Sequence, residues 1–147
     1  MSIMFAAAFA TLSLASCGCN RRSVAQATEG VVPELKSEKV NLLSVEAFAD
    51  LVTYGDVQLV DVRTPEEYAE GYLKGAMNFD FRSKGFLNMI HRLDKTRTVA
   101  VYCRSGNRSA AAAQQLHREG FRVADMQGGI MAWQKAGKPV ERTVPKE

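Results

Sequence analysis

Metal-binding residue types are scarce in this chain, which has only three cysteines and two histidines among its 147 residues. Cys17 and Cys19 lie close together, but His91 and His117 are far from them and from each other along the chain. This arrangement matches no ligand spacing of the common metal sites. We therefore expect no metal site.

Long hydrophobic runs and runs of basic residues are also missing. The apolar stretch from Ile3 to Leu14 is too short to span a bilayer. The net charge is only +3, and the 19 lysines and arginines are scattered, so a nucleic-acid partner is not expected. With 46% hydrophobic residues, the length allows one domain with an ordinary core. These features leave the oligomeric state open.

The apolar stretch at the N-terminus is typical of a secretory signal. It leads into Leu14-Ala15-Ser16-Cys17, which resembles the bacterial lipobox, where the signal is cut before a cysteine that then carries lipid. We therefore expect residues 1–16 to be a signal peptide and Cys17 to be lipidated, which would anchor an exported protein in the cell envelope or periplasm. Residues 1–5 contain no lysine or arginine, which a signal normally has, so a simply cleaved signal or a start upstream of Met1 remain alternatives.

Two polar segments flank the part of the chain that is expected to fold. Residues 17–39 lack regular apolar periodicity and are predicted to be the lipidation site and a polar tether, and residues 141–147 are predicted to be a flexible tail. The count of cysteines allows a disulfide between Cys19 and Cys103, but this bond would consume Cys103, which the loop described below predicts to be reactive. The folded domain is therefore predicted to cover residues 40–140.

Alternating strand and helix patterns within the domain predict an α/β fold, a parallel central sheet with helices on both faces. The clearest helix start is at Thr64, Pro65 and Glu67, a capping box with proline at the first helical position. We expect strands at 57–62, 77–81, 99–102 and 121–124, and helices from Ser44 to Gly55, from Thr64 to Gly71, and at 86–93, 109–119 and 130–136.

The strand predicted at 99–102 leads directly into Cys103 and a small cationic loop, C-R-S-G-N-R-S. In open α/β sheets ligands bind at the carboxyl ends of the strands, where this cysteine would lie. A loop between a strand end and a helix N-terminus directs backbone N–H groups to its centre, and Arg104 and Arg108 add two positive charges. Because such a setting stabilises a thiolate, Cys103 is predicted to be a nucleophile.

This loop resembles the active-site loop of the rhodanese family, the thiosulfate sulfurtransferases. Two further segments resemble the family's flanking signatures in the same order, L-V-D-V-R-T-P-E-E-Y-A-E-G-Y-L-K-G-A-M-N at 59–78 and M-Q-G-G-I-M-A-W-Q-K-A-G-K-P at 126–139. The resemblance covers about residues 41–140, a single rhodanese-like domain. The chain departs from the family at Tyr72, where a histidine is usual, and at Lys74, where a proline is usual.

The resemblance implies sulfur transfer in two steps. The Cys103 thiolate would attack a small anionic donor such as thiosulfate and hold the sulfur as a persulfide, which a thiol or cyanide acceptor then removes; no metal or organic cofactor is required. Arg108 is the expected contact to the donor, because its guanidinium can hold an oxyanion through two parallel bonds. The loop residues expected to bind the substrate are Arg104, Ser105, Gly106, Asn107 and Arg108.

Asp61 and Arg63 admit two roles, acid/base catalysis or an internal polar network, and Glu67 follows them at the start of the next helix. Nothing in their position places them at the nucleophile, and the resemblance implies that they hold neighbouring turns in place. We therefore expect all three to be structural.

Two other functions are compatible with the same fold. A phosphatase or arsenate reductase would also use a loop cysteine and a closing arginine, but those enzymes have five residues between the two, whereas four separate Cys103 from Arg108. The domain could also be a non-catalytic binding or sulfur-delivery module. The presence of the cysteine and both loop arginines favours the enzyme, because inactive copies often lose the cysteine.

Overall fold

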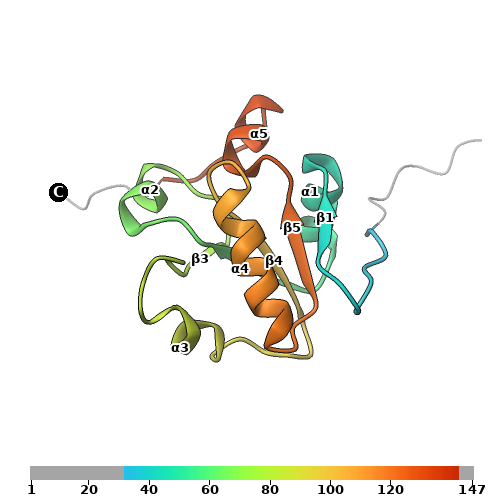
Figure 1. Cartoon of the computed structure of the whole chain (residues 1–147). Coiled ribbons are helices and arrows are strands. Elements are labelled where there is room, and N and C mark those ends of the chain that lie inside the picture. The colour runs from blue at the N-terminus through green and yellow to red at the C-terminus, as the bar shows by residue number, and fades with distance from the viewer. Residues whose placement is uncertain (1–31, 143–147) are drawn as a thin grey trace, which may run out of the picture.

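The computed structural model describes residues 32–142 (Figure 1). The predicted signal peptide, the predicted lipidation site Cys17, Cys19, most of the predicted tether and residues 143–147 of the predicted tail lie outside the described residues. No helix within residues 32–142 is long and apolar enough to cross a membrane.

Five strands form one parallel sheet in the order β1-β5-β4-β2-β3, which confirms the predicted α/β class. The central strand β4 is buried at every position, as its near-continuous apolar sequence predicts. The strands are β1 (Asn41–Leu43), β2 (Val57–Asp61), β3 (Met77–Asn78), β4 (Thr98–Tyr102) and β5 (Val123–Met126).

Helices cover both faces of this sheet (Figure 1). Val99 and Val101 of β4 pack in the cluster that α3 and α4 complete, while Ala100 and Tyr102 pack in the cluster that α1 and α5 complete. This alternation follows from the two-residue period of a strand. The helices are α1 (Val45–Tyr54), α2 (Pro65–Glu70), α3 (Phe86–Ile90), α4 (Asn107–Arg118) and α5 (Gly129–Lys135).

The first two helices begin where the sequence predicts. The Ser44 hydroxyl accepts a hydrogen bond from the Ala47 amide at 3.2 Å and caps α1. Thr64 and Glu67 form both bonds of the capping box at the start of α2. Local side-chain signals therefore fix these two helix starts.

The sequence does not predict β1, whose residues looked only like the approach to a helix. In the structure Leu43 lies opposite Met126 of β5, and the Asn41 side-chain amide donates to the Val123 carbonyl at 3.1 Å. The same amide donates to the carbonyls of Lys36 and Lys39. Three residues are too few to show alternation, and the partner strand is remote in sequence, so β1 is defined by tertiary contacts.

The strand predicted at 121–124 is displaced by two residues in β5. Gly120 ends α4 in the left-handed conformation, with φ of 88°, and the Phe121 amide donates to the Leu116 carbonyl at 3.1 Å. This Schellman arrangement assigns Phe121 to the helix end. The strand therefore starts at Val123 and continues to Met126.

Three other boundaries differ from the prediction by two residues or more. The helix predicted from residue 109 begins at Asn107, because the Ala110 amide already donates to the Gly106 carbonyl at 3.0 Å. The strand predicted at 77–81 is reduced to β3, since Asp80 starts a turn by accepting from the Arg82 amide at 2.9 Å. The helix predicted at 86–93 ends at Ile90.

Candidate active site

Cys103 directly follows β4, at the carboxyl end of the sheet, and is only 1% exposed. The Gly106 amide donates a hydrogen bond to its sulfur at 3.1 Å. The loop can turn back in this way because Gly106 has φ of 102°, a conformation that a side chain disfavours. The sulfur therefore receives a backbone N–H from a loop that leads straight into α4.

The start of α5 packs directly on the backbone of this loop. The Ile130 amide donates to the Cys103 carbonyl at 2.8 Å, and the Met131 amide donates to the Arg104 carbonyl at 3.1 Å. A Cβ on Gly129 would lie 2.4 Å from the Cys103 carbonyl oxygen, closer than real Cβ atoms approach. The close fit of two backbones therefore holds the cysteine in place.

Arg108 lies in the first turn of α4 and forms a two-bonded ion pair with Glu67 of α2. The nitrogen–oxygen distances are 2.6 and 2.7 Å. The hydrogen bonds from Arg108 lower the pKa of Glu67 to about 2, so the carboxylate is charged at neutral pH. Any donor oxyanion would therefore share the Arg108 guanidinium with Glu67.

Asp61 and Arg63 form a buried pair, 0% and 5% exposed, with a shortest nitrogen–oxygen distance of 2.6 Å. The same Arg63 nitrogen donates to the Gly71 carbonyl at 2.6 Å. The Asn78 side chain donates to the backbone carbonyls of both Asp61 and Arg63. The pair thus ties the end of β2 to the turn after α2 and to β3.

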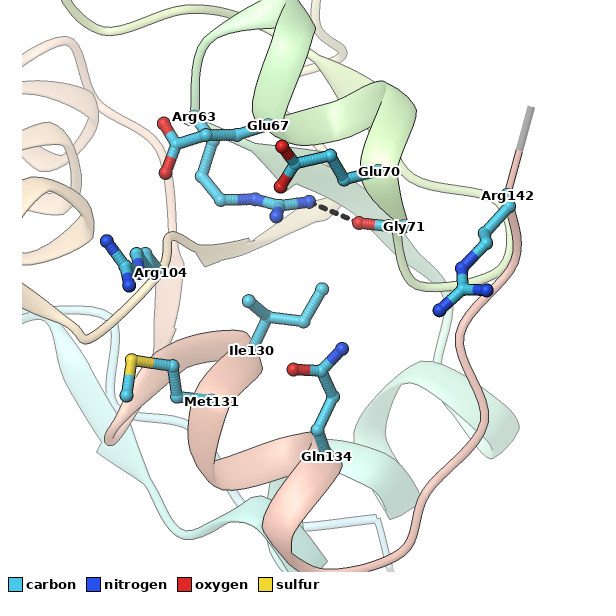
Figure 2. A pocket seen from close by; sticks show the side chains of 9 residues that line it. All are labelled: Arg63, Glu67, Glu70, Gly71, Arg104, Ile130, Met131, Gln134 and Arg142. Atoms are coloured by element: carbon cyan, nitrogen blue, oxygen red, sulfur yellow. Dashed lines mark hydrogen bonds between the residues drawn. The ribbon is translucent and has the colours of Figure 1, made fainter. Parts of the chain in front are cut away.

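A pocket of about 640 Å³ lies beside the cysteine loop (Figure 2). Arg104 lines it next to Cys103, which is itself absent from the lining. Arg63 and Glu70 lie on one side, and Gln134 reaches in from α5 on the other. The lining residues are Arg63, Glu67, Glu70, Gly71, Arg104, Ile130, Met131, Gln134 and Arg142.

The other predicted loop residues differ in their exposure. Arg104, Ser105 and Asn107 are exposed, while Gly106 and Arg108 are half-buried. Arg104, rather than Arg108, is the loop arginine that lines the pocket. Within residues 32–142, no three side chains of His, Cys, Asp or Glu are gathered so as to hold a metal ion.

The family model of the rhodanese-like domain matches residues 44–136, a range that contains every element from α1 to α5 and begins directly after β1. The chain belongs to the rhodanese-like domain family. It is 37% identical over 103 residues to a protein of Allochromatium vinosum named sulfurtransferase, with 69% of this chain and 94% of the relative covered.

One further named protein and one solved structure are similar to the rhodanese-like domain of this chain. Thiosulfate sulfurtransferase 16, chloroplastic, from Arabidopsis thaliana is 34% identical over 110 residues, which cover 67% of this chain and 91% of the relative. The crystal structure of a rhodanese-related protein from Thermoplasma volcanium matches with a TM-score of 0.64 at 27% identity, covering 70% of this chain and 99% of that one.

One buried acid of this rhodanese-like domain escaped the sequence analysis. Asp125 is 2% exposed and lies in β5 opposite Val101. Burial raises the pKa of its carboxyl to about 6, although the Ser109 hydroxyl and the Met126 amide oppose the shift. Ser109 is fully buried and donates to the Gly106 carbonyl at 3.1 Å, so the residue that influences this acid also contacts the cysteine loop. Its signal in the sequence was an aspartate directly after the strand predicted at 121–124, which ended two residues before the observed end of β5 at Met126.

Replacing Asp125 with Asn should stabilise the rhodanese-like domain at neutral pH. The pKa of about 6 lies above the ordinary 3.8, so the unfolded chain loses its proton first, and wild-type stability falls as the pH rises from about 4 to 6. We expect D125N to gain about 2–3 kcal/mol at pH 7 and little at pH 4, since one pKa unit corresponds to about 1.4 kcal/mol. Urea unfolding of both proteins at the two pH values measures the difference. An equal change in the free energy of unfolding at both pH values would contradict the raised pKa of Asp125 as its cause.

Proposed function

We propose that the protein is a sulfurtransferase that carries sulfane sulfur as a persulfide on Cys103. The main support for this proposal is the position of the Cys103 sulfur. It accepts a hydrogen bond from the Gly106 amide at 3.1 Å inside the loop between β4 and α4. Membership of the rhodanese-like family and relatives named sulfurtransferase support the same conclusion. The name of the Arabidopsis relative favours thiosulfate as the donor.

The first step transfers sulfur to the enzyme. The Cys103 thiolate attacks the outer sulfur of thiosulfate, a new S–S bond forms, and the S–S bond of thiosulfate breaks. Sulfite leaves with the electron pair of that bond, and Cys103 holds the outer sulfur as a persulfide. The Gly106 amide and the loop arginines lower the barrier by stabilising negative charge on the reacting sulfur and the donor.

The second step returns the enzyme to its starting state. The thiolate of an acceptor, or cyanide, attacks the outer sulfur of the persulfide. The S–S bond to Cys103 breaks, and its electrons restore the Cys103 thiolate. Two displacements thus replace one difficult transfer, and neither step needs a metal or a redox partner.

A persulfide on Cys103 is the direct test of this function. The protein is reduced, incubated with thiosulfate and examined by intact-mass spectrometry. We expect one added sulfur atom, which cyanide then removes as thiocyanate. A protein that gains no sulfur and forms no thiocyanate would contradict the proposal and favour a non-catalytic module.

Arg108 can act in this reaction as a donor contact or only through its ion pair with Glu67. We expect Arg108→Ala to lower kcat/KM for thiosulfate by more than about ten-fold, because a charged hydrogen bond contributes roughly 1.5–3 kcal/mol. Glu67→Ala is the comparison variant, since it breaks the same pair, together with the capping-box bond to the Thr64 amide, but keeps the cation. A larger loss in R108A than in E67A supports a donor contact. Equal losses would mean that Arg108 only positions α4.

A further inference from the structure

Arg142 lines the pocket although it lies outside the part of the chain that matches the family. The family match ends at residue 136, and the chain then returns to the pocket wall formed by the turn after α2. Figure 2 shows Arg142 on the side of the pocket opposite Arg104, near Gly71 and above Gln134. The position of this arginine is therefore a property of the C-terminal segment of this chain.

Two backbone hydrogen bonds fix that segment. The Tyr72 amide donates to the Glu141 carbonyl at 2.8 Å, and the Glu141 amide donates to the Tyr72 carbonyl at 2.7 Å. They form an antiparallel bridge, which we call the C-terminal clamp. The residue after the clamp is Arg142.

The turn that receives the clamp is itself held by the core. Arg63 donates to the Gly71 carbonyl at 2.6 Å, and the Leu73 amide donates to the buried Tyr102 hydroxyl at 3.1 Å. The rings of Tyr68 and Tyr72 stack with their centroids 4.2 Å apart. Tyr72 is also the position where this sequence departs from the family's usual histidine. Arg142 is thus anchored, through the clamp, to a turn that Arg63 and Tyr102 hold in place.

The charges of the pocket lining are not balanced internally. Arg63 is neutralised by Asp61, and Glu67 is neutralised by Arg108. Within residues 32–142, Arg104 and Arg142 form no ion pair, and the remaining charge is the carboxylate of Glu70. The lining therefore offers two cations and one anion to a ligand.

The size of the pocket indicates a ligand larger than the donor. Its volume of about 640 Å³ lies within the range of pockets that bind organic small molecules, roughly 300–1,000 Å³. Thiosulfate and cyanide have only a few atoms and would leave most of it empty. Ile130 and Met131 add apolar surface next to the backbone that holds Cys103.

We propose that Arg142 determines acceptor specificity, selecting a peptide-sized thiol that carries carboxylates and an amino group. Its carboxylates bind Arg142 and Arg104, its amino group faces Glu70, and its thiolate reaches the persulfide on Cys103. This inference rests on the proposed function, because it assigns the acceptor of the second step.

The test compares an acidic peptide thiol with acceptors that carry no carboxylate. Glutathione is the acidic probe, and dithiothreitol and cyanide are the others, all with thiosulfate as donor. We expect Arg142→Gln to raise KM for glutathione about ten-fold, the effect of losing one charged hydrogen bond, and to leave turnover with dithiothreitol and cyanide unchanged. Arg118→Gln, at the exposed end of α4, removes an equal charge elsewhere and should change none of the three.

A second pair of variants tests the clamp. Glu141→Pro removes the amide that donates to Tyr72 but keeps the arginine, so it should raise KM for glutathione as R142Q does. Glu141→Gln retains the amide and should behave as wild type. Equal KM values for glutathione in wild type, R142Q and E141P would overturn the inference.

A binding measurement separates this inference from the proposed function. S-methylglutathione cannot accept sulfur, so its dissociation constant, measured by calorimetry, does not depend on catalysis. We expect about ten-fold weaker binding to R142Q than to the wild type. If thiocyanate forms but this ligand binds both proteins equally, the inference about Arg142 is wrong and the sulfurtransferase stands. If the ligand binds through Arg142 but no sulfur is transferred, the proposed function is wrong.

Discussion

Cys103→Ser should abolish sulfur transfer, with kcat/KM for thiosulfate lowered by at least about 10³-fold, as when other enzymes lose their nucleophile. A serine hydroxyl is a far weaker nucleophile than a thiolate, and it cannot form a persulfide. Its size is nearly the same, so it fits a site where the cysteine is 1% exposed, and the Gly106 amide can still donate to it. The thiocyanate assay measures turnover, and intact mass measures loading.

The same variant must be shown to fold. Urea unfolding of C103S should give a free energy of unfolding close to the wild-type value, because no contact of the loop depends on the sulfur alone. Folded protein that retains activity within ten-fold of wild type would exclude Cys103 as the sulfur carrier.

Gly129→Ala is expected to have the largest effect on the fold. The new Cβ would lie 2.4 Å from the Cys103 carbonyl oxygen and 2.6 Å from the Arg104 carbonyl oxygen, and both contacts are to backbone. The residue also has φ of 59°, in the left-handed region. We expect a loss of more than about 3 kcal/mol of stability, the upper end of overpacking effects, together with the loss of sulfur transfer.

Gly137→Ala is the matched control. Gly137 has φ of 71°, but a Cβ there would meet nothing within 4 Å. The alanine variant therefore has the left-handed backbone strain of about 1–2 kcal/mol but no steric clash. Urea unfolding of both variants, with thiocyanate formation at saturating thiosulfate, measures the difference. Similar losses in the two variants would mean that the α5 start does not hold the cysteine backbone.

Local signals in the sequence predicted the elements whose causes are themselves local. The capping box at Thr64 and Glu67 is complete within four residues, and β4 is a continuous apolar run because it is buried on both faces. These segments appear in the structure nearly as predicted. The existence of a turn and a helix after Cys103 follows for the same reason.

Contacts between remote residues account for what the sequence did not reveal. Arg108 and Glu67 are 41 positions apart, so nothing local indicates that the expected donor contact already holds a carboxylate. β1 exists only because β5 pairs with it, and the start of β5 depends on how α4 ends. Arg142 reaches the pocket through a bridge to Tyr72, 70 positions before it. The catalytic role of Cys103 stays a prediction until the persulfide is measured.

The C-terminal clamp has a practical consequence for how this protein is purified and assayed. Five residues separate Arg142 from a tag fused after Glu147, and a five-residue segment can span at most about 18 Å. Such a tag therefore starts within that distance of the pocket wall, and a polyhistidine tag would bring close to the arginine imidazole groups that become cationic below about pH 6.5. Kinetic constants for acidic acceptors should be taken from protein whose C-terminal tag has been removed.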